Sequence, residues 1–388
     1  MALKNNTWKL NQWYDQSVAG NVSYSGLNLL WGWGDNENGG LGLNSTNAGY
    51  SSPIQVSDAT TWKFPPSGAS HTAETSVLVK TDGTLWSWGY NTYGMLGQNS
   101  VVHISSPTQI PGTTWNTAIM GRNNTMATKT DGTLWTWGNN YRGVFGTNQA
   151  HNIKVSSPVQ VPGTTWDKIY SSNTAVFAIK TDNTLWSWGM NSYAGLGHNN
   201  NTNYSSPTQV PGTTWARVGS GDEYGTMATK TDGTLWAWGG NGSGALGQNN
   251  TTWYSSPKQI PGTTWDYTAD YKMACGANAR WAIKTDGTLW SWGYNNQGAL
   301  GQNNTTQYSS PIQVPGTTWN IVSSSYADEI MAIKTDGAMW NWGRSGYTGG
   351  PIFEGQAFPS MRSSPVQLPG TWANVLDTRR LTFAEKVI

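Results

Sequence analysis

The chain has 388 residues, of which only 11% are charged, and it contains 25 Trp, 47 Gly and a net charge of +1. A charge balance this close to zero gives no electrostatic attraction to nucleic acid or to an anionic membrane surface. A single cysteine, Cys275, excludes a disulfide framework, and with only four scattered histidines no metal and no cofactor is expected.

The first residues, 1–20, contain Trp8 and Trp13 but no apolar stretch and no small-residue cleavage site. They are therefore not expected to be a secretory signal, and the protein is expected to be made in the cytoplasm. No apolar run in the chain is long enough to insert into a membrane.

A unit of about 50 residues then repeats along the chain. Its most regular part is Trp-x-Trp-Gly, which begins at Trp31, Trp86, Trp135, Trp186, Trp236, Trp290 and Trp340, at spacings of 55, 49, 51, 50, 54 and 50 residues. Lys-Thr-Asp-Gly or a close variant precedes the last six copies, and Ser-Ser-Pro follows all seven. A period of this length indicates an array of small supersecondary units.

Each unit is predicted to fold as four antiparallel strands. In the third unit, β-type runs at 126–130 and 133–137 flank an Asp-Gly pair, which is typical of a hairpin with a type I′ turn. The glycine of this pair, Gly132, is therefore expected at positive φ. The segments 115–120 and 108–110 are predicted as further strands, and the proline of Ser-Ser-Pro is expected to start an edge strand.

Four antiparallel strands repeated seven times predict an all-β, seven-bladed β-propeller that spans residues 1–388 as one domain. Stacking the blades covers both faces of each sheet, so the tryptophan pairs are expected to fill the contacts between blades. The tail at 371–388 restarts the unit after the seventh blade. We expect this tail and the segment 1–20 to help close the ring by covering open sheet edges, and the sequence leaves open which end does so.

The repeat resembles that of the regulator of chromosome condensation family, whose blades carry Asp-Gly, an aromatic residue, Trp-Gly-x-Asn and Gly-x-Leu-Gly in this order. The sixth unit shows the pattern over residues 285–301, from Thr-Asp-Gly through Trp-Ser-Trp-Gly-Tyr-Asn to Gly-Ala-Leu-Gly. The resemblance covers nearly the whole chain. It implies a circular seven-bladed propeller in which the first strand of each blade lies nearest the axis.

For function the resemblance implies less, because one fold hosts many activities. The founding member of the family exchanges guanine nucleotides on a small GTPase and docks on nucleosomes, using a protruding wedge and basic segments. The spacings in this chain leave no room for a long wedge, and the sequence contains no cluster of Lys and Arg.

Antiparallel connectivity places alternate turns on opposite faces of the disc. The Asp-Gly hairpins and the Pro-Gly-Thr links share one face and hardly vary between repeats. The other face carries the turns between first and second strands and the loops from Trp-Gly to Ser-Ser-Pro, which vary, as at 101–104, 150–154 and 201–204. Because variable turns permit specific binding, this variable face is predicted to hold the partner.

Two groups of residues are candidates for binding. The first is acidic and is expected in the first turns of blades five, six and seven, rimming one side of the central opening: Asp222, Glu223, Asp270, Asp328 and Glu329. Grouped carboxylates serve a glycan-cleaving enzyme or bind a cation, and the alternative is that they are solvated loop tips. No calcium-loop pattern, nucleophile elbow or phosphate-binding loop accompanies them.

The second group lies in the seventh blade, where the segment between Trp-Gly and Ser-Ser-Pro is about four residues longer than in the sixth. Its residues are of types enriched at interface cores: Arg344, Tyr347, Phe353, Phe358, Met361 and Arg362. The alternative is that the phenylalanines fill the local core where the ring closes.

These features predict a non-catalytic structural or interaction protein of a virion, such as a bacteriophage tail or capsid surface, or of an extracellular surface. The polar loops and the closely similar copies look like those of bacterial and bacteriophage surface proteins. The expected partner is another virion or surface protein, or a host-surface glycan. A glycan-degrading enzyme and a cytoplasmic exchange-factor-like scaffold are the alternatives.

Overall fold

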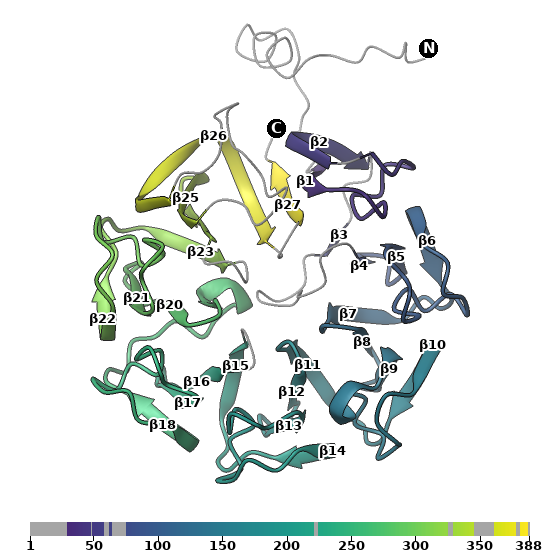
Figure 1. Ribbon diagram of the computed structural model, residues 1–388, viewed down its shortest axis with the longest axis horizontal. Coiled ribbons are helices and arrows are strands. Elements are labelled where there is room, and N and C mark those ends of the chain that lie inside the picture. Colours follow the sequence, from purple (N-terminus) through teal and green to yellow (C-terminus); the bar gives the residue numbers. More distant parts are fainter. Residues whose placement is uncertain are drawn as a thin grey trace, which may run out of the picture.

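A computed structural model shows β-sheets arranged as blades around a central axis (Figure 1). It describes residues 29–47, 49–57, 62–63, 75–220, 224–324, 329–344, 361–377 and 381–386. Among these residues, five sheets have four antiparallel strands each, and one has seven because β26 (Met361–Asp377) is shared by two blades. The predicted seven-bladed all-β propeller is confirmed. The only helical elements in the described part are two short 3₁₀ turns, η1 (Tyr141–Gly143) and η2 (Asp270–Lys272).

Blades two to six each run from an inner strand to an outer strand in chain order (Figure 1). Blade two has β3 (Trp62–Lys63), β4 (Thr75–Lys80), β5 (Leu85–Gly89) and β6 (Ile104–Ile110). Blade three has β7 (Trp115–Met120), β8 (Asn124–Lys129), β9 (Leu134–Asn139) and β10 (Lys154–Val161). Blade four has β11 (Trp166–Ser171), β12 (Ala175–Lys180), β13 (Leu185–Gly189) and β14 (Tyr204–Gln209). Blade five has β15 (Trp215–Ser220), β16 (Gly225–Lys230), β17 (Leu235–Gly239) and β18 (Tyr254–Ile260). Blade six has β19 (Met273–Cys275), β20 (Ala279–Ile283), β21 (Leu289–Gly293) and β22 (Tyr308–Gln313).

Blades seven and one are joined through β26. Blade seven has β23 (Trp319–Ser324), β24 (Glu329–Lys334), β25 (Ala338–Arg344) and the first part of β26, whereas blade one has the second part of β26, β27 (Leu381–Lys386), β1 (Leu29–Asp35) and β2 (Gly49–Ser57). β26 pairs with β25 from Met361 to Thr371 and with β27 from Trp372 to Asp377. β27 in turn pairs with β1, so C-terminal strands supply the inner half of blade one. The segment 1–20 lies outside the described residues.

The Asp-Gly hairpins are built as three-residue loops. Gly132 has φ +77°, as predicted, and its N–H donates to the carbonyl of Lys129 at 3.0 Å. The expected type I′ turn is wrong, because Asp131 does not adopt positive φ. The Asp131 carboxylate instead accepts the N–H of Thr133 at 2.9 Å and its hydroxyl at 2.6 Å, and the left-handed position falls to the glycine alone. In blade four, Asn183 takes that position with φ +61°.

The tryptophan pairs fill the contacts between blades, as expected. The second tryptophan of each pair is fully buried, and in blades two to seven it donates its indole N–H to a backbone carbonyl of the preceding blade. Trp137 donates to Met95 at 2.7 Å, and Trp238 donates to Gly195 at 2.7 Å. The hydrophobic clusters accordingly combine side chains of adjacent blades, so the core is a series of interfaces around the ring.

The outermost strands differ from their predicted form. β6 begins at Ile104 rather than near 108, and in blade three Pro158 lies inside β10. The ladder between β10 and β9 is interrupted between Val155 and Val159, where the proline lies. This irregularity leaves the missing N–H of the proline outside the hydrogen-bonded ladder, so an edge strand can continue through it.

Candidate functional site on the loop face

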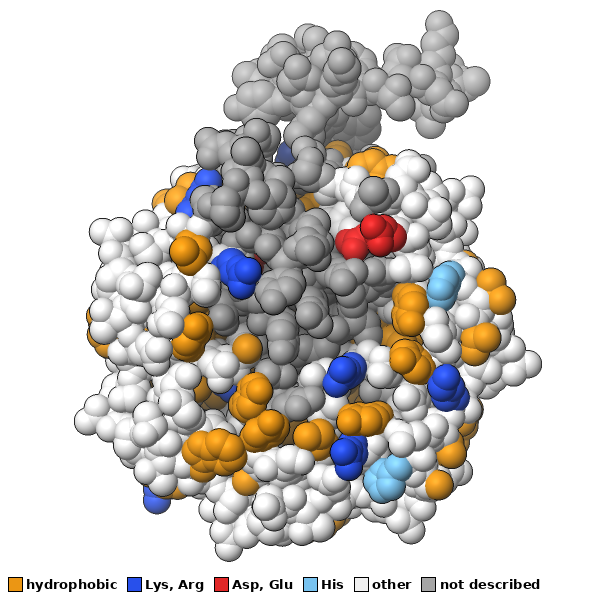
Figure 2. Space-filling view, in the orientation of Figure 1, with side chains coloured by type: hydrophobic (Ala, Val, Ile, Leu, Met, Phe, Trp, Pro, Cys, Tyr) orange, Lys and Arg blue, Asp and Glu red, His pale blue; other side chains and the backbone are white. Residues whose placement is uncertain are grey.

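The disc has two chemically different faces. On the hairpin face the hairpins contact the links between blades, since the backbone N–H of Trp166 donates to the carbonyl of Gly132 at 3.0 Å. This face carries an exposed aspartate in six blades: Asp82, Asp131, Asp182, Asp232, Asp286 and Asp336. Figure 2 shows a face with a single acidic patch, which is therefore the opposite one, the loop face.

In blades two to six a buried asparagine holds the long loop of the loop face in the same shape. In blade five, Asn241 accepts the N–H of Leu246 at 2.8 Å and donates its amide to the carbonyls of Asn250 and Thr252 at 3.0 and 2.9 Å. Asn91, Asn140, Asn191 and Asn295 repeat the bond to the residue five positions later. The loops therefore share one backbone conformation, and the blades differ in the side chains that these loops carry.

One loop position, just before the outer strand, changes its residue from blade to blade. In blade two His103 accepts the N–H of Asn91 at 2.9 Å, and in blade four Asn203 accepts the N–H of Asn191 at 2.7 Å. In blade six Gln307 donates to the side chain of Asn296 at 3.2 Å. Blade five has Trp253 at this position, and an indole cannot accept such a bond.

Trp253 instead contributes to an aromatic cluster that joins blades four and five. The cluster consists of Tyr193, Tyr224 and Trp253: the ring centroids of Tyr193 and Trp253 are 5.8 Å apart, and those of Tyr193 and Tyr224 are 4.6 Å apart. Trp253 is 51% exposed, whereas no other tryptophan among the described residues is an exposed large hydrophobic. Figure 2 shows hydrophobic side chains following the lower blades of this face. The sequence analysis missed Trp253. It could have been found as a tryptophan that lies outside the repeated motifs, at a loop position that varies between blades.

A second aromatic group lies in blades two and three. Tyr90 stacks on His103 with centroids 4.9 Å apart, and Lys154 places its ammonium 4.9 Å from the ring centroid of Tyr93. Val101 and Val102, at the tip of the same loop, are 55% and 67% exposed. The loop face therefore carries aromatic and apolar groups on several blades.

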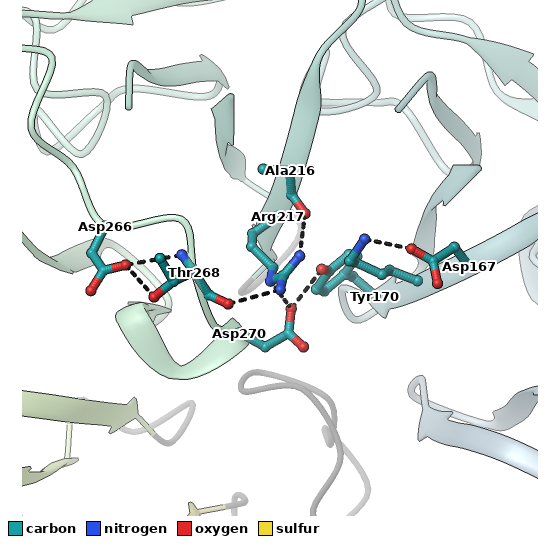
Figure 3. A network of polar contacts seen from close by, with 8 residues as sticks. Asp167, Tyr170, Ala216, Arg217, Asp266, Thr268 and Asp270 are labelled. Carbon is teal, nitrogen blue, oxygen red and sulfur yellow. Dashed lines mark hydrogen bonds and ion pairs between the residues drawn. The ribbon is translucent and has the colours of Figure 1, made fainter. Parts of the chain in front are cut away.

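Asp270, predicted in the turn between the first and second strands of blade six, lies before the first strand instead, in η2. Met273 follows Trp265 by eight positions, whereas its counterpart in blade five, Val218, follows Trp215 by three. The chain thus has a five-residue insertion here. Figure 3 shows Asp270 directed at blades four and five. Its carboxylate accepts the Tyr170 hydroxyl at 2.7 Å and forms an ion pair with Arg217 at 3.0 Å.

The network around Asp270 connects four blades. Arg217 also donates to the carbonyls of Ala216 and Thr268 (Figure 3). Lys272 donates to Asn320 in blade seven at 2.7 Å. Burial, with the Asp270 carboxylate beside it, raises the pKa of Tyr170 well above its usual value. Asp270 is thus engaged in joining blades and is not a solvated loop tip.

The other predicted acidic residues are not brought together with Asp270 by the described structure. Glu329 lies in β24 rather than in a turn, is 5% exposed, and accepts the Asn341 amide at 3.0 Å. It is consequently unavailable to a ligand at the surface, which corrects the expectation that it rims the opening. Asp222, Glu223 and Asp328 lie outside the described residues.

The predicted binding group of the seventh blade is described only at its base. Arg344 ends β25 and pairs in the ladder with Met361, the first residue of β26, and Arg362 pairs with Gly343. Met361 is 61% exposed. Tyr347, Phe353 and Phe358 lie outside the described residues.

Titratable groups elsewhere do not assemble into a centre within the described part of the chain. No group of three or more His, Cys, Asp or Glu side chains there could hold a metal ion. His198 lies against the Ser187 hydroxyl at 2.9 Å, and burial lowers its pKa. Burial likewise raises the pKa of Cys275 to about 11, which keeps this thiol protonated. No helix of the described residues is long and apolar enough to cross a membrane.

Comparison with known proteins decides the family. Residues 21–329 match the RCC1-like domain, which covers well over half of the chain. The chain belongs to the RCC1-like domain family. The RCC1-like repeat thus accounts for the hairpins, the buried asparagines of the loops and the tryptophans between blades.

Solved RCC1-like propellers share the fold at low sequence identity. Human WBSCR16 superposes with a TM-score of 0.78 at 15% identity, over 93% of this chain and 99% of the other. Prp20p from Saccharomyces cerevisiae, whose structure is described with its binding to Gsp1p and histones, gives 0.76 at 17% identity over 94% and 92%. The yeast RCC1 (Prp20) in a complex with Kap60 gives 0.74 at 16% identity over 93% and 89%. At these identities the likeness establishes the propeller architecture.

Proposed function

We propose that this RCC1-like propeller is a non-enzymatic interaction protein whose loop face binds a glycan through the aromatic cluster Tyr193, Tyr224 and Trp253. The observation that carries the proposal is the exposure of Trp253, 51%, on a protein whose other described tryptophans are buried or half-buried. An exposed indole costs solubility when unpaired, and it becomes an anchor when a partner desolvates it.

The surroundings of the cluster favour a sugar as its partner. Trp253 and Tyr193 are tilted by 52° to each other, so their rings form an angled surface rather than a flat hydrophobic patch. The neighbouring loop positions are amides and hydroxyls, among them Asn201, Thr251 and Thr252, all exposed. A pyranose ring has apolar C–H faces that suit aromatic rings and hydroxyls that suit amides, and this combination matches both halves of the surface.

We further propose that the protein acts on the surface of a virion, where it would bind a host-surface glycan. The support is compositional: 11% charged residues, polar loops of Asn, Thr and Ser, and repeats that stay closely alike. A partner protein of the virion, in the way that Gsp1p and histones are partners of Prp20p, is the alternative occupant of the loop face.

The proposal is tested on an array of bacterial and host-surface glycans with two reciprocal variants. Trp253→Gln introduces the residue that blade six has at the same position, Gln307, so the loop frame is expected to be retained. We expect binding to fall at least about tenfold, because a central aromatic anchor is lost. His103→Asn, which introduces the blade-four residue into blade two, is the matched control and leaves the aromatic cluster intact.

Other outcomes discriminate between the alternatives. Retention of a polysaccharide of unchanged length supports binding without turnover, whereas shortened products would indicate a glycan-degrading enzyme. Binding to no glycan by the native protein, together with capture of a virion protein that Trp253→Gln abolishes, would assign the same surface to a protein partner. Equal glycan binding by Trp253→Gln and the native protein would exclude the aromatic cluster as the site.

A further inference from the structure

A groove between blades two and three has the dimensions of a small-ligand site and is separate from the aromatic cluster. Its volume is about 310 Å³, at the lower end of the range for ligand pockets, roughly 300–1,000 Å³. Blade two contributes Gln98, Asn99 and Pro111, and blade three contributes Lys129 and Trp135. The outer strand of blade three adds Ser157 and Pro158. A groove of this size suits one or two sugar rings.

Lys129 is a half-buried cation that forms no direct ion pair among the described residues. Its ammonium lies 4.7 Å from the ring centroid of Trp115 and 4.4 Å from that of Trp135, so two indoles hold it in place. Within the described part of the chain the Lys129 ammonium makes no hydrogen bond and no ion pair. A carboxylate entering the groove would give this ammonium a charge-assisted hydrogen bond that the protein itself does not supply.

We propose that this groove binds a carboxylate-bearing sugar, with Lys129 holding the carboxylate. The indole faces of Trp115 and Trp135 are occupied by the ammonium, so recognition here is ionic rather than by stacking on those faces. The apolar walls, Ile110 and Pro111, suit the C–H face of a sugar ring. Asn99 and Ser157 offer an amide and a hydroxyl for the ring hydroxyls.

The same chemistry recurs at the other blade contacts. Lys80, Lys180, Lys230, Lys284 and Lys334 each lie over two tryptophans in the way that Lys129 does. In the described part none of these five forms an ion pair. A repeated cation of this kind makes the ring multivalent toward an acidic glycan, which raises avidity without a new contact.

The charged group nearest to Lys129 in sequence on this face is Asp131, in the hairpin. Its Oδ1 is occupied by the N–H and hydroxyl of Thr133, and it forms no direct ion pair with Lys129, although after these hydrogen bonds the Lys129 charge also contributes to lowering the Asp131 pKa. It nevertheless opposes an incoming carboxylate by repulsion. Asp131→Asn preserves an acceptor for Thr133 and removes that charge, so it is expected to strengthen binding.

The test uses digalacturonic acid and its methyl ester, which has a similar shape without the charges. Indole N–H resonances of the full-length protein labelled with ¹⁵N-tryptophan report on each lysine site separately, through Trp135 for this groove and Trp186 for the Lys180 site of the next blade contact. We expect the acid to shift the Trp135 resonance and to bind at least about tenfold more tightly than the ester. Lys129→Met, which keeps an unbranched apolar side chain over the indoles, should abolish the Trp135 shift and leave the Trp186 shift in place.

Two results would overturn the proposal: equal affinity for the acid and the ester, or an unchanged Trp135 shift in Lys129→Met. Unchanged Trp186 titration in that variant shows that the fold is preserved, and Asp131→Asn provides a second variant in which binding should tighten. The outcome is independent of the loop face, because Trp253→Gln leaves the groove intact. Loss of glycan binding in Trp253→Gln alone assigns binding to the aromatic cluster, and loss in Lys129→Met alone assigns it to the groove.

Discussion

Two tryptophans of blade five show how the repeated and the variable regions of this propeller differ. Trp238 belongs to Trp-x-Trp-Gly, is fully buried, and donates to the Gly195 carbonyl of blade four at 2.7 Å. Trp253 lies in the variable loop, is 51% exposed, and contacts Tyr193 across the blade boundary. Residues that every blade shares thus build the contacts between blades, whereas a residue that one blade alone carries remains exposed on the loop face.

Truncating each of these side chains gives the largest contrast. Trp238→Ala removes a fully buried indole and its hydrogen bond, and we expect a loss of about 3–5 kcal/mol in the free energy of unfolding. Trp253→Gln should change that free energy by less than about 0.5 kcal/mol, as is usual for surface substitutions. Chemical denaturation followed by tryptophan fluorescence measures both. Similar losses in the two variants would show that Trp253 is part of the scaffold.

The insertion of blade six should be the next most sensitive feature. Arg217→Met removes the cation that Asp270 pairs with at 3.0 Å, while Tyr170 remains bonded to the same carboxylate. Both charged side chains are mostly buried, at 18% and 26% exposure. We therefore expect a loss of about 1–3 kcal/mol in the free energy of unfolding. The loop-face binding of glycans should be unchanged.

A double variant separates the ion pair from packing. Asp270→Asn combined with Arg217→Met should cost less than the sum of the single changes, because neither charge is then left without its partner. Strict additivity would indicate that the two side chains contribute independently and that the blades are not joined by this pair.

The sequence predicted the shared parts of the fold well because they obey local rules. The position of Gly132 followed from hairpin chemistry, and the burial of Trp137 followed from the spacing of two along a strand. The bounds of β7, Trp115–Met120, were predicted to the residue. Each of these features depends on residues close in sequence, and seven copies of the pattern reduce the ambiguity of any single one.

The features that sequence reasoning missed depend on contacts between distant segments. A β26 strand that serves two blades can be recognised only when β25 and β27 are placed beside it. Asp270 looked like a turn residue because the five-residue insertion before β19 cannot be located from spacing alone. The contact between Trp253 and Tyr193 joins two blades, so neither residue's own repeat contains the other.

A smaller effect tests how completely the hairpins repeat one hydrogen-bond pattern. In blade three the Trp135 indole donates to the Thr133 hydroxyl at 2.9 Å, whereas blade seven has Ala338 at that position and the buried Trp340 indole N–H has no partner among the described residues. Ala338→Thr should therefore stabilise the protein by about 1 kcal/mol, and Thr133→Ala should destabilise it by a similar amount. Paired thermal melts measure both. No gain from Ala338→Thr would mean that the indole hydrogen bond contributes nothing.

The smallest expected effect is that the stability difference between the native protein and Thr133→Ala depends on pH. Hydrogen bonds from Thr133, the hydroxyl first and then the backbone N–H, lower the pKa of Asp131 below its ordinary value of 3.8. A carboxyl whose pKa is lower in the folded state contributes stability above the unfolded pKa and loses it as the pH falls through the folded pKa. The difference in melting temperature between the native protein and Thr133→Ala should thus be largest near neutral pH and should shrink below about pH 4, because a protonated Asp131 no longer gains from Thr133. Trp253→Gln, which alters no ionisable group, should melt with the same small difference from the native protein at both pH values. A Thr133→Ala deficit that stays constant with pH would assign the whole effect to the indole hydrogen bond and none to the aspartate.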